Sequence, residues 1–207
     1  MMLTGFAEGE LQLEERAARG GGSRLRGRFP YNKRAILSDG GRTGRPRKEQ
    51  FAPRAFAYNV ERSDVDIRLL VGHDYGKPLA SRGAGTLSLK DSDAALTFEA
   101  TISEELQAAS WVSDFFAGFA AGLIVGLSPG FRIPPERVAP NAEKVEEEDP
   151  KEGTALIRTI FEALLFELSV VTAAAYSEAQ VEARSWHLTT GGLATPRRPV
   201  PAAARWR

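Results

Sequence analysis

The chain of 207 residues contains no cysteine, which excludes disulfides, zinc–thiolate sites and a cysteine nucleophile. Its N-terminus lacks the long apolar segment of a signal peptide, and no window reaches the roughly 20 apolar residues that a membrane-spanning helix needs. Metal-ligand clusters, P-loops and dinucleotide fingerprints are also missing. We therefore expect one soluble, cytoplasmic domain that binds no metal or cofactor and has no membrane partner.

The charged residues are balanced in number, 27 basic against 27 acidic, but are unevenly distributed. Residues 14–54 hold 12 Arg and Lys against four acids, and residues 136–152 hold seven acids against three bases. Residues 184–207 hold five arginines and no acid. Such blocks are typical of solvated loops and tails, or of surfaces that bind nucleic acid or a charged protein. Nucleic-acid binding has little support, because aromatic residues are sparse among the N-terminal arginines.

Three strand-like segments carry the residue types of a serine hydrolase triad. Residues 66–72 form an apolar strand that ends in His73, and residues 122–133 form a glycine-containing strand that includes Ser128. Residues 164–172 are apolar on both faces except at Glu167, which predicts a central strand. Strand alternation would place His73 at the end of an apolar row, where it would be partly buried.

His73 is the candidate base, because the chain has only two histidines and His187 lies beside the basic C-terminal segment. A serine hydroxyl needs such a base to become a good nucleophile. A lone histidine on a strand is also common as a structural residue, and Ser128 is equally compatible with a small strand residue that has no chemistry. Ser169 is a weaker nucleophile candidate, since its neighbours are bulky and apolar.

Glu167 needs a partner, because an ionised carboxylate in an apolar run costs several kcal/mol unless it is paired. A histidine N–H would pair with it and would itself be oriented by the contact. Arg158 or a position at a sheet edge facing water would also satisfy it. Asp74 is the rival carboxylate, but it adjoins His73, and neighbouring residues of a strand point to opposite faces.

Pro129 directly follows Ser128 and has no backbone N–H, so it cannot donate to an oxyanion. Arg132 and the amide of Gly130 are the candidate donors.

The remaining segments give coarser expectations. Residues 42–48 indicate a surface loop, either mobile or flanking a binding groove, and residues 136–153 a surface loop or unordered insertion. The other expected elements are helices over residues 53–60, 177–184 and from Ser103 to near Gly118 or Gly122, a hairpin over residues 84–102, a strand over residues 24–31 and a turn over residues 75–78.

Five segments occur in a characteristic order: FAPRAF (51–56), GHD (72–74), GAGTL (83–87), GLSPGF (126–131) and FELSVV (166–171). Together they resemble the prohead (capsid maturation) proteases of tailed bacteriophages, which are relatives of the herpesvirus assemblin proteases. The resemblance covers about residues 3–183. The chain departs from the family at residues 173–175, where three alanines replace the usual Pro-Ala pair.

The resemblance implies an α+β fold, a mainly antiparallel, partly closed β-barrel surrounded by a few helices. We expect a protease domain at residues 1–186. Beyond Trp186 the composition turns to Gly, Pro, Ala and Arg, which predicts a disordered basic tail rich in Pro and Ala at residues 187–207. The matching residues of the family make Ser128 the nucleophile, His73 the base and Glu167 the orienting carboxylate, where the herpesvirus relatives use a second histidine.

By the same resemblance, the function is that of a serine endopeptidase of head maturation. It would lie inside the immature capsid in the host cytoplasm, or in the bacterial cytoplasm if it comes from a prophage. Its partner would be the major capsid protein, whose scaffold segment it would cleave, and it would also process itself. Self-association is a further expectation, since dimers are known among the herpesvirus relatives. The alternative is a non-catalytic scaffold or head-assembly protein that keeps the fold and binds capsid subunits.

Overall fold

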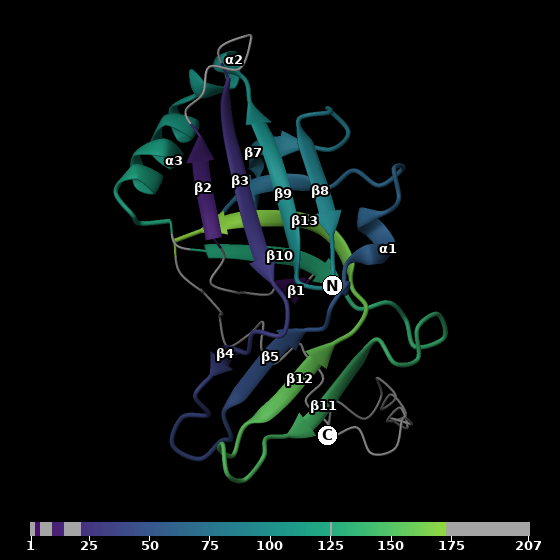
Figure 1. Ribbon diagram of the computed structural model, residues 1–207. Helices are drawn as coiled ribbons and strands as arrows, with labels where there is room; N and C mark the ends of the chain where they lie inside the picture. Colours follow the sequence, from purple (N-terminus) through teal and green to yellow (C-terminus); the bar gives the residue numbers. More distant parts are fainter. Residues whose placement is uncertain (1–2, 5–9, 15–21, 125, 173–207) are drawn as a thin grey trace, which may run out of the picture.

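The computed structural model describes residues 3–4, 10–14, 22–124 and 126–172 of the chain. Within these ranges, thirteen strands form three sheets and are accompanied by three short helices (Figure 1). Most strand pairs are antiparallel. The α+β class expected from the sequence is confirmed.

The first sheet has the strand order β1-β10-β13-β6-β7. Its strands are β1 (Leu3–Thr4), β10 (Gly126–Arg132), β13 (Leu164–Val171), β6 (Arg68–Val71) and β7 (Asp74–Ser81). Strand β13 pairs antiparallel with β10 and parallel with β6. The prediction that residues 164–172 form a central strand is therefore confirmed.

The second sheet is wholly antiparallel and has the order β2-β3-β9-β8. Its strands are β2 (Glu10–Glu14), β3 (Ser23–Pro30), β9 (Ala95–Ile102) and β8 (Leu87–Asp91). Strands β8 and β9 form the hairpin that the sequence predicts, and β3 is the strand predicted over residues 24–31. In Figure 1, β10 and β13 of the first sheet cross behind β3 and β9.

The third sheet has the order β11-β12-β5-β4 and lies below the other two in Figure 1. Its strands are β11 (Glu143–Glu147), β12 (Leu156–Ile160), β5 (Arg47–Phe51) and β4 (Ala35–Ser38). The loop predicted over residues 42–48 is confirmed up to Pro46, where β5 follows. The loop predicted over residues 136–153 is wrong at residues 143–147, which form β11. The sequence did not predict strand β11, because this strand pairs on one side only and buries a single residue, Val145, so its apolar pattern is weak.

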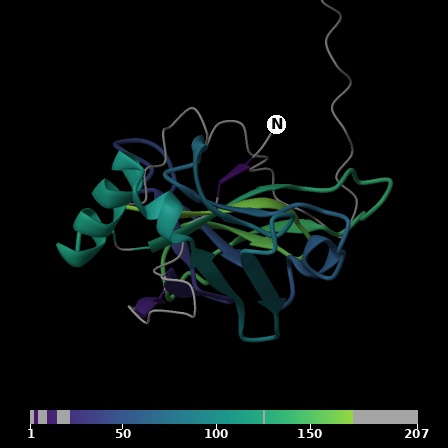
Figure 2. The ribbon, with the colours of Figure 1, turned by 90° about the horizontal axis from the view of Figure 1, so that it is seen from above.

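The helices are shorter than the sequence predicts. Helix α1 covers only Ala57–Val60, although the pattern starts at Pro53. The helix expected from Ser103 is two helices, α2 (Glu104–Gln107) and α3 (Ser110–Ala120), because Ala109 is extended with φ −70° and ψ 133°. Ser103 caps α2 as expected, accepting a hydrogen bond from the Leu106 amide. Figure 2 shows α3 at one end of the sheets and α1 at the other.

In the described part of the chain, the strand order of each sheet is open and no sheet closes on itself. The partly closed barrel is therefore not confirmed and stays a prediction. None of the described helices is long and apolar enough to cross a membrane. The predicted helix over residues 177–184, His187, the domain boundary at residue 186 and the tail at residues 187–207 lie outside the described residues.

A cluster of aromatic rings joins the three sheets. Phe51, at the end of β5, lies 5.4 Å from the ring of Phe29 on β3 and 5.2 Å from the ring of Phe131 on β10. Phe56 packs against all three rings and is completely buried. Edge-to-face contacts of this kind stabilise beyond the burial of apolar area. The cluster therefore attaches the third sheet to the core of the other two.

Replacing Phe51 by Ala should lower the free energy of unfolding by about 3–5 kcal/mol, because it removes a buried ring that contacts two other sheets. Chemical denaturation measures the change. Ile36→Ala on the adjacent strand β4 is the control, since Ile36 is 65% exposed and its loss should change stability by less than about 0.5 kcal/mol. Equal effects of the two substitutions would contradict the role of the ring cluster.

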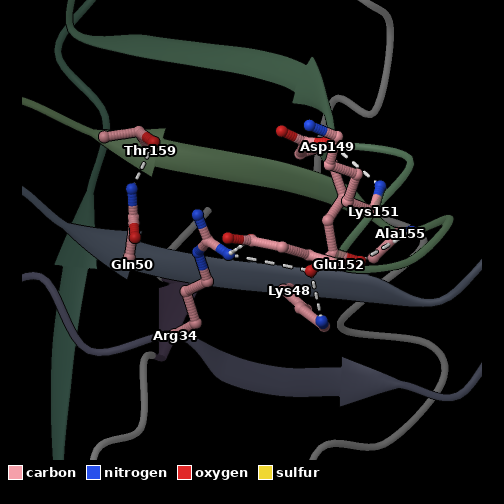
Figure 3. Close-up of polar contacts among 9 residues, drawn as sticks. Arg34, Lys48, Gln50, Asp149, Lys151, Glu152, Ala155 and Thr159 are labelled. Carbon is pink, nitrogen blue, oxygen red and sulfur yellow. Dashed lines mark hydrogen bonds and ion pairs between the residues drawn. The ribbon is translucent and has the colours of Figure 1, made fainter.

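Charged residues beside the third sheet also form pairs. Arg34 donates to Glu152 at 2.7 Å (Figure 3). Lys48 on β5 donates to the buried carboxylate of Glu148. The hydrogen bond from Lys48 holds the pKa of Glu148 below its usual range. Folding therefore favours ionised Glu148, and this contribution to stability is present above its unfolded pKa and is lost as the pH falls.

Candidate active site

His73 lies on a two-residue turn between β6 and β7 and not at the end of a strand. Val71 pairs with Asp74, which leaves Gly72 and His73 as the loop, with φ of 62° and 64°. Two consecutive positive φ angles in a two-residue hairpin are the requirement of a type I′ turn. The expected position of His73 at the end of an apolar row is therefore wrong, because β6 ends at Val71 and the turn begins at Gly72.

The same turn corrects the assignment of residues 75–78, which belong to β7 and not to a turn. The sequence predicted a turn at these residues because Gly76 and Pro78 are typical turn residues. Strand β7 tolerates both because it is an edge strand of the first sheet. A Gly-His pair is a weaker hairpin signal than Asn-Gly, although histidine is enriched among residues with positive φ.

Strands β10 and β13 bring the other two predicted residues to the same face of the first sheet. Ser128 is opposite Ser169, and Gly130 is opposite Glu167. The register then shifts, so that Phe131 is opposite Leu165 and Phe166 has no counterpart. This is a β-bulge directly beside Glu167, and bulges often re-aim side chains next to active sites.

The side chain of His73 lies between Ser128 and Glu167. Its Nδ1 is 2.7 Å from Oε1 of Glu167, and its Nε2 is 2.9 Å from Oγ of Ser128. A carboxylate can only accept, so Nδ1 carries a proton and donates to Glu167. In the neutral ring, Nε2 is then the acceptor for the Ser128 hydroxyl. The structure thus brings together His73, Ser128 and Glu167, the three residues selected from the sequence.

The three residues differ in their access to water. The side chain of Glu167 is completely buried, Ser128 is 6% exposed and the His73 side chain is 28% exposed. A buried carboxylate that accepts hydrogen bonds stabilises a neighbouring imidazolium more strongly than an exposed one. The arrangement can therefore move a proton from the serine hydroxyl to the ring while the positive charge is balanced.

The profile of one protein family, described as caudovirus prohead serine protease, matches residues 40–191. The chain belongs to this family. No significant match was found among curated proteins or among solved structures. At the level of the family, the chain is a serine protease of bacteriophage capsid maturation that interacts with capsid proteins. The relation to the herpesvirus assemblin proteases stays a prediction.

Ser169 is a fourth residue of the site, in a role that the sequence did not suggest. Its hydroxyl donates to Oε2 of Glu167 at 2.7 Å and accepts from the backbone N–H of His73 at 3.0 Å. The available signal was its position two residues after Glu167, which puts both side chains on one face of the strand.

Asp74 and Arg158, the alternative partners considered for His73 and Glu167, make their contacts with other residues. Asp74 is exposed, accepts from the Gly76 amide at 2.8 Å and faces Lys77 at 3.6 Å. Arg158 is buried in the third sheet and donates to Glu49 at 3.0 Å and to Glu143. Arg158 is therefore not the partner of Glu167, which also does not lie at an edge of its sheet.

Two further residues lie on strands of the first sheet, Arg132 on β10 and Tyr75 on β7. The guanidinium of Arg132 is 5.2 Å from the ring centroid of Phe166, so this candidate oxyanion donor is held against an aromatic face. Tyr75 on β7 is 45% exposed. Its burial and the negative charge of Glu167 raise the pKa of Tyr75 above its ordinary value. Tyr75 therefore lies within electrostatic reach of the site, which its expected place in a turn did not suggest.

A hollow of about 370 Å³ lies on another part of the molecule. It is lined by residues of β3, β8 and β9, among them Arg28, Lys90 and Thr97. These strands belong to the second sheet, so this hollow is not part of the candidate active site. Among the residues that the structure describes, no group of three or more His, Asp or Glu has the arrangement of a metal site.

Gly130 provides the space that the Glu167 side chain occupies. A Cβ atom at position 130 would lie 1.9 Å from Oε1 and 2.8 Å from Cγ of Glu167. Real Cβ atoms do not approach other atoms so closely, and the carboxylate is enclosed and hydrogen-bonded. A side chain at position 130 therefore requires Glu167 to move.

Gly130→Ala should destabilise the protein by about 1–3 kcal/mol, because the new methyl group overlaps a buried, hydrogen-bonded carboxylate. Gly118→Ala is the matched control, since a Cβ there would lie 3.7 Å from Ile124 in ordinary contact. Inside helix α3, this control should raise stability by up to about 1 kcal/mol. Urea denaturation of both variants tests the prediction, and equal stability of Gly130→Ala and the unmodified chain would contradict it.

Proposed function

We propose that the chain is a serine endopeptidase that cleaves the scaffold segment from the major capsid protein inside the immature capsid and also processes itself. The observation that carries the proposal is the hydrogen-bonded series Ser128–His73–Glu167 in a member of the prohead protease family. The protease domain covers residues 1–186, and the basic segment at residues 187–207 follows it as a tail.

In this proposal Ser128 is the nucleophile. Its Oγ attacks the carbonyl carbon of the scissile peptide bond while Nε2 of His73 takes the hydroxyl proton. The tetrahedral intermediate collapses with cleavage of the C–N bond, and the imidazolium gives the proton to the leaving amine. Water then attacks the acyl-enzyme with His73 again as the base, which releases the acid and restores the serine.

Glu167 keeps its charge throughout the cycle. It holds the proton of His73 on Nδ1, so that Nε2 faces Ser128 with a free lone pair, and it stabilises the imidazolium that forms. The oxyanion needs donors other than residue 129, since Pro129 has no N–H. Arg132 and the amide of Gly130 are the candidates for this role, supported by their position on β10, four and two residues after Ser128.

Co-expression with the major capsid protein of the same phage tests the proposal. The intact mass of the capsid protein should fall by one defined N-terminal segment with the unmodified chain and stay unchanged with Ser128→Ala or His73→Ala, because each removes a reacting group. Ser113→Ala is the control: it removes a hydroxyl from an exposed residue of α3 and should leave cleavage intact.

Cleavage by Ser128→Ala or His73→Ala would refute the assignment of these residues. If no chain trims the capsid protein although all of them fold and co-assemble with it, the chain is a non-catalytic head-assembly protein. Labelling of Ser128 by a covalent serine probe distinguishes a protease from a non-catalytic head-assembly protein, because the probe reacts with an activated serine.

A further inference from the structure

Ser169 is completely buried, yet its hydroxyl makes two hydrogen bonds to residues of the candidate triad. It donates to Oε2 of Glu167 at 2.7 Å and accepts from the backbone N–H of His73 at 3.0 Å. A hydroxyl is the smallest side-chain group that can donate and accept at once. One atom of β13 is thus connected both to the acid and to the turn that carries the histidine.

The turn at His73 depends on strand β13 for its hydrogen bonds. The Gly72 amide donates to the Val170 carbonyl at 3.0 Å, and the next amide, that of His73, donates to the Ser169 hydroxyl. The positive φ of His73 is unfavourable for a residue with a Cβ atom, relative to the right-handed conformation. A buried hydrogen bond at this amide helps to hold the residue in that conformation.

The carboxylate of Glu167 is also oriented by this contact. Its Oε1 faces His73, and its Oε2 accepts from Ser169. The terminal torsion of a glutamate is broad, so one hydrogen bond alone defines its plane poorly. A second bond to the other oxygen fixes the plane, and with it the direction of Oε1 toward Nδ1.

We propose that Ser169 is a positioning residue of this site, which holds the His73 backbone and the Glu167 carboxylate in the geometry needed to activate Ser128. The inference rests on the proposed serine protease function and deepens it. Ser169 acts through the other two residues and does not touch the substrate, because its side chain has no access to solvent and its proton is donated to Glu167. The same facts argue against Ser169 as a nucleophile.

The loss of the hydroxyl leaves two buried polar groups without their partner, the His73 amide and one oxygen of Glu167. Both residues then gain freedom, and small displacements of catalytic groups cost up to about 100-fold in rate. We therefore expect the reactivity of Ser128 in Ser169→Ala to fall by about 10- to 100-fold. Affinity for a small probe should not change, since Ser169 lies behind the reacting groups.

A fluorophosphonate probe measures this without knowledge of the natural substrate. The maximal rate of inactivation and the concentration for half-maximal rate are determined separately, and peptide mapping assigns the label to Ser128. Ser169→Ala should lower the rate and leave the half-maximal concentration unchanged. Ser169→Cys, whose thiol is somewhat larger than the hydroxyl and is a weaker donor and acceptor, should lie between Ser169→Ala and the unmodified chain.

Ser81→Ala is the matched control in the same sheet. The Ser81 hydroxyl also donates to a carboxylate, that of Asp66 at 2.7 Å, and accepts from a backbone amide, that of Ala84 at 3.3 Å. It therefore loses the same two kinds of hydrogen bond away from the site. Its rate of labelling should stay within twofold of the unmodified chain.

Thermal denaturation of each variant gives the folded fraction at the temperature of the assay. Labelling of Ser169→Ala at the unmodified rate per folded molecule would overturn the inference, as would an equal loss in Ser81→Ala. If Ser169→Ala does not fold, Ser169→Cys decides, and the unmodified rate in that variant is the contradicting result. Absence of any label on Ser128 in the unmodified chain would contradict the proposed function itself.

Discussion

The arrangement of the site depends on the burial of one carboxylate. Glu167 is completely enclosed in the central strand of the first sheet, where an unpaired charge would be strongly destabilising. The surrounding chain therefore has to supply donors for both oxygens and space for the group. His73 and Ser169 are the donors, and Gly130 leaves the space. The turn, the serine and the glycine are separate consequences of the same constraint.

Strand β13 contributes to the core and to the site at the same time. Leu168 and Val170 pack into the core, while Glu167 and Ser169 face the turn that carries His73. The twofold period of a strand separates the two functions, because alternate side chains point to opposite faces. The core fixes the strand, and the strand in turn holds the polar groups in place.

Several features of the site could be predicted from the sequence because they concern single residue types. A lone Glu in an apolar run needs a partner, one of two histidines is the available base, and a Pro after Ser128 lacks an amide hydrogen. The central position of β13 also followed from its apolar faces. The helix at Ser103, by contrast, divides at Ala109, and β11 buries only Val145. Local propensity carries little information about such breaks and edges.

The sequence by itself determined which residues were available for the chemistry, since the chain has two histidines, no cysteine and a single acid among the apolar residues 164–171. Only the tertiary structure decided how they meet. A two-residue turn with positive φ, a β-bulge at Phe166 and the register of β10 on β13 set the distances between His73, Ser128 and Glu167. These features come from pairing between strands far apart in the chain, and local patterns of polarity do not encode that pairing.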